Sequence, residues 1–228
     1  MDDGADSVEM SLRMLEESAR QGVDLIFATS HFYADEDDPH SFLQRRNEAY
    51  QVLRAAMEKR GGRYPGILLG AEVLYFPGMS VADELRTLAM GNTPCLLVEP
   101  PLVHWTDTML DEIEETGTNL KCIPVIAHID RYMRILKDNT LFDRIEGRKM
   151  LVQVNASFFV YPETAEMALR YLQADKIHFV GSDCHNMTSR APNLAAAADN
   201  INRSGCAAAF EMLNRRVYTF LDTCQKAY

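Results

Sequence analysis

The stretch PVIAHIDRY, from Pro124 to Tyr132, decides the fold class of this chain. It begins with the apolar run PVIA, which is too short for an independent helix and is typical of a buried strand. His128 ends the run, and Asp130 and Arg131 follow directly. Because the strands of parallel α/β sheets and barrels carry their functional residues at their carboxyl ends, this order predicts a functional strand end.

The rest of the chain repeats this arrangement of an apolar run followed by a polar end. The predicted strands are residues 23–29, 66–72, 95–99, 122–128, 150–155 and 176–183. The predicted helices are residues 7–21, 41–60, 81–90, 106–116, 142–146, 163–173, 193–203 and 206–218, the first capped by a D-x-x-E pattern at Asp6 and Glu9. Alternating strands and helices predict an α/β fold with a parallel sheet and right-handed crossovers, here an incomplete or distorted (β/α) barrel.

Composition limits the kinds of partner and compartment. The 228 residues suit a single domain, 1–228, and 47% of them are hydrophobic. A net charge of -10 makes nucleic acid a poor partner. The five cysteines form no CxxC pair, which favours a reducing cytoplasm. We expect no membrane span and no signal peptide, since no apolar run approaches roughly 20 residues and the chain begins MDDGAD.

The polar residues at the strand ends are of one chemical kind. In chain order they are His31, Glu72, Glu99, His128, Asn155, Asp183 and, just beyond, His185. Imidazole and carboxylate are ligands for zinc, manganese or iron(II). Any one of these residues has an ordinary alternative, such as a hydrogen-bonded histidine or a helix cap. The whole series at successive strand ends predicts a shared metal site.

Two arginines follow these candidate ligands, Arg131 after His128 and Arg190 after His185. Either arginine alone is as well explained by a surface ion pair. Beside a metal site, however, a guanidinium suits bidentate phosphate binding. The combination predicts hydrolysis of a phosphate ester, in which metals activate water and polarise the phosphoryl oxygens. We expect His178 to be a packed residue within a strand.

In their order and spacing, these motifs resemble the PHP-superfamily protein-tyrosine phosphatases of bacterial capsule and exopolysaccharide clusters. The motifs are DDG (2–4), TSH (29–31), GAE (70–72), VE (98–99), PVIAHIDRY, QVN (153–155) and SDCHN (182–186). The resemblance implies a distorted (β/α)7 TIM-like barrel and a metal-dependent phosphatase. The metal is typically manganese, with iron, zinc or magnesium as alternatives, and the family site holds up to three ions.

The same resemblance implies roles for single residues. One metal would be bound by Asp3, His31 and His185. A second metal would be bound by Glu72, Glu99 and His128, with Glu72 bridging, and Asp183 would bind the third. The substrate phosphate would be held by Arg131 and Arg190. A metal-activated hydroxide would attack phosphorus. The implied substrate is a phosphotyrosyl protein, namely a membrane-anchored bacterial tyrosine autokinase.

The chain departs from the family pattern at its start. The family opens with a strand carrying H-x-H before DDG, whereas this sequence begins MDDG. We therefore expect a barrel without its first strand, fewer bound metals and reduced turnover, because the metal at Asp183 would keep only Glu72 and Asp183. Either the natural start lies upstream of this methionine, which we favour, or the protein is truncated.

Three alternatives remain open. A small-molecule phosphatase of the histidinol-phosphatase type would use the same site. A metal-binding protein with degraded activity would follow from the missing H-x-H ligands. Cys184 to Arg190 also reads C-x5-R, the loop pattern of cysteine phosphatases. The segment CHNMTSR contains no glycine, and Asp183 would raise the pKa of the thiol, so the sequence disfavours this third alternative.

Overall fold

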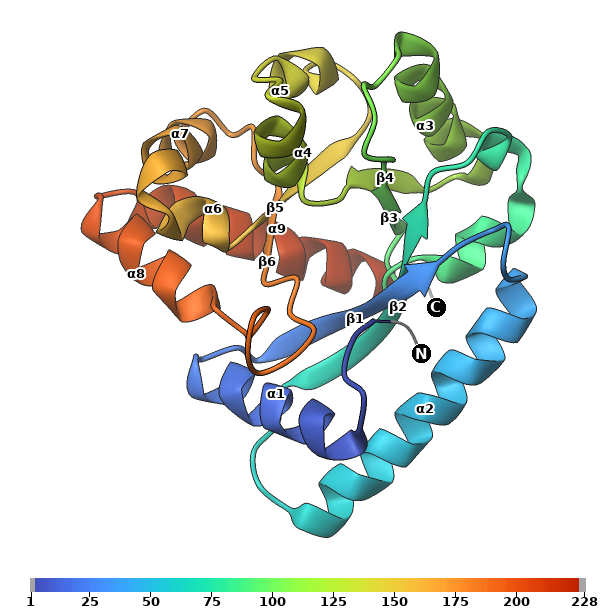
Figure 1. Cartoon of the computed structure of the whole chain (residues 1–228), viewed down its shortest axis with the longest axis vertical. Helices are drawn as coiled ribbons and strands as arrows, with labels where there is room; N and C mark the ends of the chain where they lie inside the picture. The colour runs from blue at the N-terminus through green and yellow to red at the C-terminus, as the bar shows by residue number, and fades with distance from the viewer. Residues whose placement is uncertain (1–2, 226–228) are drawn as a thin grey trace.

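The structure is a computed structural model that describes residues 3–225, with side chains from residue 3 to residue 221. Six parallel strands lie in sequential order, β1 to β6. They are β1 (Leu25–Phe32), β2 (Gly66–Leu74), β3 (Cys95–Glu99), β4 (Ile123–Ile126), β5 (Leu151–Asn155) and β6 (Phe179–Gly181). The sheet curls, and helices cover its outer side (Figure 1). This parallel half-barrel confirms the predicted α/β class.

The helices precede the first strand, connect successive strands or follow the last one. They are α1 (Val8–Arg20), α2 (Pro39–Arg60), α3 (Asp107–Leu120), α4 (Ile129–Leu136), α5 (Leu141–Ile145), α6 (Ser157–Val160), α7 (Pro162–Gln173), α8 (Leu194–Arg203) and α9 (Ala207–Gln225), with the short 3-10 helices η1 (Met79–Val81) and η2 (Asp83–Leu88). In the part of the chain that the structure describes, no helix has the length and apolar character to cross a membrane.

Most of the core lies between the outer side of the sheet and the helices. It includes the fully buried Trp105, Leu110, Ile113 and Tyr132. A smaller cluster that includes Leu97 and Val125 packs with Phe220 of α9. Cys95 and Cys122 are buried, as expected of small core residues. Among the described residues, β1 and β6 each pair with one strand only, so the six strands do not close into a complete barrel.

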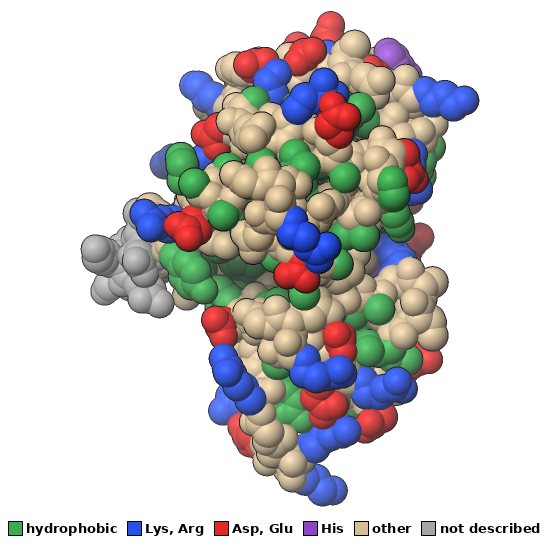
Figure 2. All heavy atoms as spheres, turned by 90° about the vertical axis from the view of Figure 1, so that its left-hand side faces the viewer, with side chains coloured by type: hydrophobic (Ala, Val, Ile, Leu, Met, Phe, Trp, Pro, Cys, Tyr) green, Lys and Arg blue, Asp and Glu red, His purple; other side chains and the backbone are tan. Residues whose placement is uncertain are grey.

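Charges are well mixed on part of the surface. Figure 2 shows acidic and basic side chains interspersed over the face that is turned to the viewer. The net charge of -10 is therefore not gathered into one acidic patch on that face.

Several local predictions were wrong. The first helix is capped by Ser7, whose hydroxyl accepts from Met10 N, while Asp6 accepts from that same hydroxyl. The helix expected over residues 81–90 is the pair η1 and η2, because Ala82 (φ -89°, ψ 79°) leaves the helical region between them. The strand expected to reach His128 ends at Ile126, because His128 adopts a left-handed conformation (φ 30°) and α4 begins directly after it.

The last strand, β6, also ends earlier than predicted. The strand stops at Gly181, and Asp183 lies beyond it with φ 51°. His178 precedes the strand rather than lying within it, but it is packed as expected. Its backbone N–H donates to Val152 O at 2.9 Å, and its Nδ1 accepts from Val152 N at 3.1 Å. Burial lowers the pKa of His178.

Candidate active site

The predicted site residues gather at the carboxyl ends of the strands. The register of the sheet begins this arrangement, since His31 of β1 is paired with Glu72 of β2, and Leu74 of β2 with Glu99 of β3. Paired residues on neighbouring parallel strands point to the same face of the sheet. His31 and Glu72 therefore project together at one edge.

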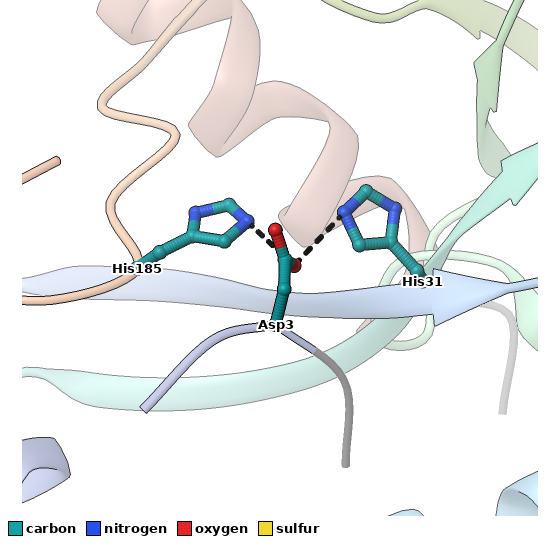
Figure 3. A group of neighbouring side chains, drawn as sticks. All are labelled: Asp3, His31 and His185. Carbon is teal, nitrogen blue, oxygen red and sulfur yellow. Dashed lines mark ion pairs between the residues drawn. The ribbon is translucent and has the colours of Figure 1, made fainter. Parts of the chain in front are cut away.

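Asp3 joins two histidines that are distant in sequence. Its Oδ1 lies 3.1 Å from Nε2 of His185 and 3.5 Å from Nε2 of His31. Figure 3 shows the carboxylate between the two rings, with His31 extending from β1 and His185 from the loop after β6. The three donors could hold one ion, since their ligand atoms lie within 4.8 Å of one another.

His31 also belongs to a second group of possible ligands, with Glu72 and Glu99. Its Nδ1 lies 3.5 Å from Oε2 of Glu99, while its Nε2 faces Asp3. The two nitrogens of one ring thus face two different carboxylates. Tyr33 stacks on this ring, with centroids 5.6 Å apart and planes at 13°. The imidazole of His31 therefore links the two groups.

His128 faces the two glutamates of the second group. Its Nε2 lies 2.7 Å from Oε1 of Glu72 and 3.3 Å from Oε1 of Glu99. Burial opposes the charged imidazolium, but hydrogen bonds to the two glutamates outweigh it and raise the pKa of His128 to about 9. Burial also opposes ionisation of Glu99, and the hydrogen bond to His128 nevertheless lowers the pKa of that carboxyl.

Asp183 lies between the two arginines. Its Oδ1 accepts from Arg190 at 2.6 Å, and its Oδ2 pairs with Arg131. Asn155 Nδ2 also donates to Oδ2, at 3.3 Å. Burial would raise the pKa of Asp183, but the two guanidinium groups lower it. Arg131 also lies 3.5 Å from Glu99, and Arg190 lies 3.4 Å from Asp3. The two arginines therefore connect Asp183 to Glu99 and to Asp3.

The donor set fits divalent metal ions. Two ligand atoms that are each about 2.1 Å from one ion are separated by about 3.0 to 3.4 Å at octahedral or tetrahedral angles. The contacts of Asp3 with its two histidines, at 3.1 and 3.5 Å, fall in or near this range. The four site carboxylates outnumber the two site arginines. Carboxylates that are partly removed from water need positive charge beside them, which metal ions would supply. Imidazole and carboxylate together suit zinc, manganese or iron(II).

Two supporting residues lie in the quoted motifs, but the sequence assigned them no role. Gln153 accepts through its side-chain oxygen from the backbone N–H of His128, which holds the left-handed turn. Tyr132 stacks on the His128 ring, with centroids 5.4 Å apart, and donates its hydroxyl to the carbonyl of Pro100. The available signal was a polar Gln153 inside an otherwise apolar strand. Asp2 of the DDG motif lies outside the described residues.

Cys184 lies in this region but has unsuitable surroundings for a nucleophile. Burial raises the pKa of its thiol, whereas a cysteine phosphatase needs a thiolate with a lowered pKa. The nearby carboxylate of Asp183 acts in the same direction, as the sequence suggested. These surroundings argue against the C-x5-R alternative.

Comparison with known proteins gives a consistent result. The family model for capsular polysaccharide synthesis proteins CpsB/CapC matches residues 1–216. The tyrosine-protein phosphatase CpsB of Streptococcus agalactiae is 30% identical over 209 residues, covering 86% of this chain and 83% of that protein. The tyrosine-protein phosphatase YwqE of Bacillus subtilis is 27% identical over 202 residues, covering 83% and 75%.

A solved structure extends this similarity to the fold. A chain from a crystallographic study of YwqE from Bacillus subtilis and CpsB from Streptococcus pneumoniae superposes with a TM-score of 0.83 at 24% identity. The match covers 97% of this chain and 90% of that one, and those proteins are described as metal-dependent tyrosine phosphatases. The match of the family model to residues 1–216 shows that this chain belongs to the CpsB/CapC family of capsular polysaccharide synthesis proteins.

Proposed function

We propose that this chain is a metal-dependent phosphatase that hydrolyses phosphotyrosine on protein during capsule or exopolysaccharide synthesis. The observation that carries the proposal is the meeting of two ligand groups at His31 beside two arginines that share Asp183. The relatives named tyrosine-protein phosphatases support the same activity. A phosphate monoester needs both kinds of group, because its charge must be bound and a water must be activated.

Each residue of the site has a role in this proposal. Asp3, His31 and His185 would hold one metal; Glu72, Glu99 and His128 a second; and Asp183 would contribute to a third. Manganese is the proposed metal, with iron, zinc or magnesium as alternatives. When bound, the metals would activate water and polarise the phosphoryl oxygens.

Arg131 and Arg190 would bind and orient the substrate phosphate. They approach opposite oxygens of Asp183, so the two guanidinium groups already lie on either side of one small anionic group. Their side chains are 23% and 33% exposed, and both can therefore be reached by a substrate from solvent. Planar guanidinium groups bind phosphate oxygens in pairs, which fixes the direction of the ester bond.

The proposal also covers the superfamily, the compartment and the substrate protein. The curled sheet would be the barrel of one PHP domain, 1–228, acting in the cytoplasm. The phosphotyrosyl substrate would be a bacterial tyrosine autokinase.

The test compares three substrates with the manganese-loaded protein: a phosphotyrosyl peptide, the matching phosphoseryl peptide and histidinol phosphate. We expect the highest kcat/KM for the phosphotyrosyl peptide and loss of turnover in Arg131→Gln. Arg13→Gln, which changes an exposed arginine on helix α1 outside the site, is the matched control. A higher kcat/KM for histidinol phosphate would favour the small-molecule alternative. Bound manganese without turnover of any substrate would favour the metal-binding protein.

A further inference from the structure

A small cavity adjoins the phosphate-binding side of the candidate site. Its volume is about 70 Å³, and it lies between α4 and the segment that contains α6 and the start of α7. Arg131 and Asn155 belong both to this cavity and to the site around Asp183. The cavity can receive the end of a polar side chain. It therefore offers a second point of contact beside the substrate phosphate.

The charge of this cavity comes from Arg134. Arg131 and Arg134 are three residues apart on α4, so they lie on one side of the helix, about 5 to 6 Å apart at Cβ. Arg131 is paired with Glu99 and Asp183, whereas Arg134 has no ion pair among the described side chains. The one carboxylate in the wall, Asp130, accepts the backbone N–H of Asn155 at 2.8 Å. Arg134 is thus an unpaired cation at an opening beside the site.

The other walls suit a polypeptide ligand. Ser157 lines the cavity, and its hydroxyl has no hydrogen-bond partner among residues 3–221. Tyr161 also lines the cavity and is 47% exposed, and the preceding residue, Val160, is 38% exposed, although both side chains are large and hydrophobic. A free inorganic anion would gain nothing from these two side chains, whereas a peptide would cover them.

We propose that Arg134 and Ser157 bind the carboxylate of an aspartate or glutamate that flanks the phosphotyrosine in the substrate. This inference rests on the proposed phosphatase activity. In an extended peptide, side chains two residues apart lie on the same side and about 7 Å apart, which is close to the separation of Arg131 and Arg134. The subsite would therefore select an acidic residue within about two positions of the phosphotyrosine.

The test measures kcat/KM of the manganese-loaded protein on phosphotyrosyl peptides that carry glutamate or alanine at each flanking position in turn. At one position the glutamate peptide should be preferred by about tenfold, mainly through a lower KM, as a charge-assisted contact of about 1.4 kcal/mol predicts. Arg134→Gln should reduce this ratio to about one, and Arg134→Lys should retain part of it. Arg170→Gln, an exposed arginine on α7 that does not line the cavity, should keep the full ratio.

Three outcomes would overturn the subsite. One is a glutamate preference that is absent at every position. Another is a preference that survives in Arg134→Gln while this variant keeps the native circular dichroism spectrum. The third is an Arg134→Gln variant in which inhibition by inorganic phosphate is weakened as much as the glutamate preference, which would assign Arg134 to the phosphate site itself. The proposed function fails separately, if the unchanged protein hydrolyses none of the phosphotyrosyl peptides.

Discussion

The buried pair of His128 with Glu72 makes a quantitative prediction about metal uptake. The imidazole is 2% exposed and its pKa is raised to about 9, so at neutral pH it carries a proton in the metal-free protein. A metal ion binds only the neutral ring, and it must therefore displace this proton. Each pH unit below 9 costs about 1.4 kcal/mol, or about tenfold in apparent affinity. Between pH 7 and 8.5 the affinity of this site should rise about 25-fold, since part of the imidazole is already neutral at pH 8.5.

Isothermal titration calorimetry with Mn²⁺ under nitrogen measures this dependence of metal affinity on pH. Repeating the titration in buffers of different ionisation enthalpy gives the number of protons released, which should include one from His128 at pH 7. His128→Ala should lose this metal altogether. His104→Gln, which changes an exposed loop histidine, should keep both the affinity and its dependence on pH. An affinity that is flat between pH 7 and 8.5, or His128→Ala with undiminished metal content, would refute the assigned role of His128.

Three further predictions concern the mechanism and stability. Chelation should abolish phosphatase activity while Cys184→Ser keeps it, because burial raises the pKa of that thiol; the opposite pair of results would restore the cysteine mechanism. The folded pKa of His128, about 9, exceeds its ordinary 6.5, so its charge stabilises the metal-free protein fully below pH 6.5. This contribution, about 3 kcal/mol, should disappear as pH rises through 9 in urea unfolding, and it should be missing in His128→Ala. Gly117→Ala should destabilise the protein by about 1 to 3 kcal/mol, although alanine is a better helix former than glycine. The reason is that the Cβ of the new alanine would lie 2.7 Å from Cδ of the Pro124 ring. An increase in melting temperature would contradict this packing argument.

Local pattern was sufficient for the order of the elements and the chemistry of their ends. The strand predicted at residues 95–99 is observed with the same bounds, and the other strands overlap their predicted ranges. A short apolar run that ends in imidazole or carboxylate can be recognised as a strand from its own sequence, because a buried strand requires apolar side chains along its length. The helices α4 and α6 were missed, since α4 directly follows a strand and α6 has only four residues.

The grouping of the site residues required the tertiary structure. Asp3 and His185 lie 3.1 Å apart although nearly the whole described chain separates them, and periodicity contains no information on such contacts. The left-handed turns at His128 and Asp183 redirect both side chains after their strands end, and non-glycine residues seldom adopt this conformation. The sequence alone determined which residues could bind metal and phosphate, beginning with PVIAHIDRY. Only the fold decided that His31 belongs to two groups of possible metal ligands and that Arg134 lines a cavity together with Arg131. Register, turns and helix packing set the distances between these side chains.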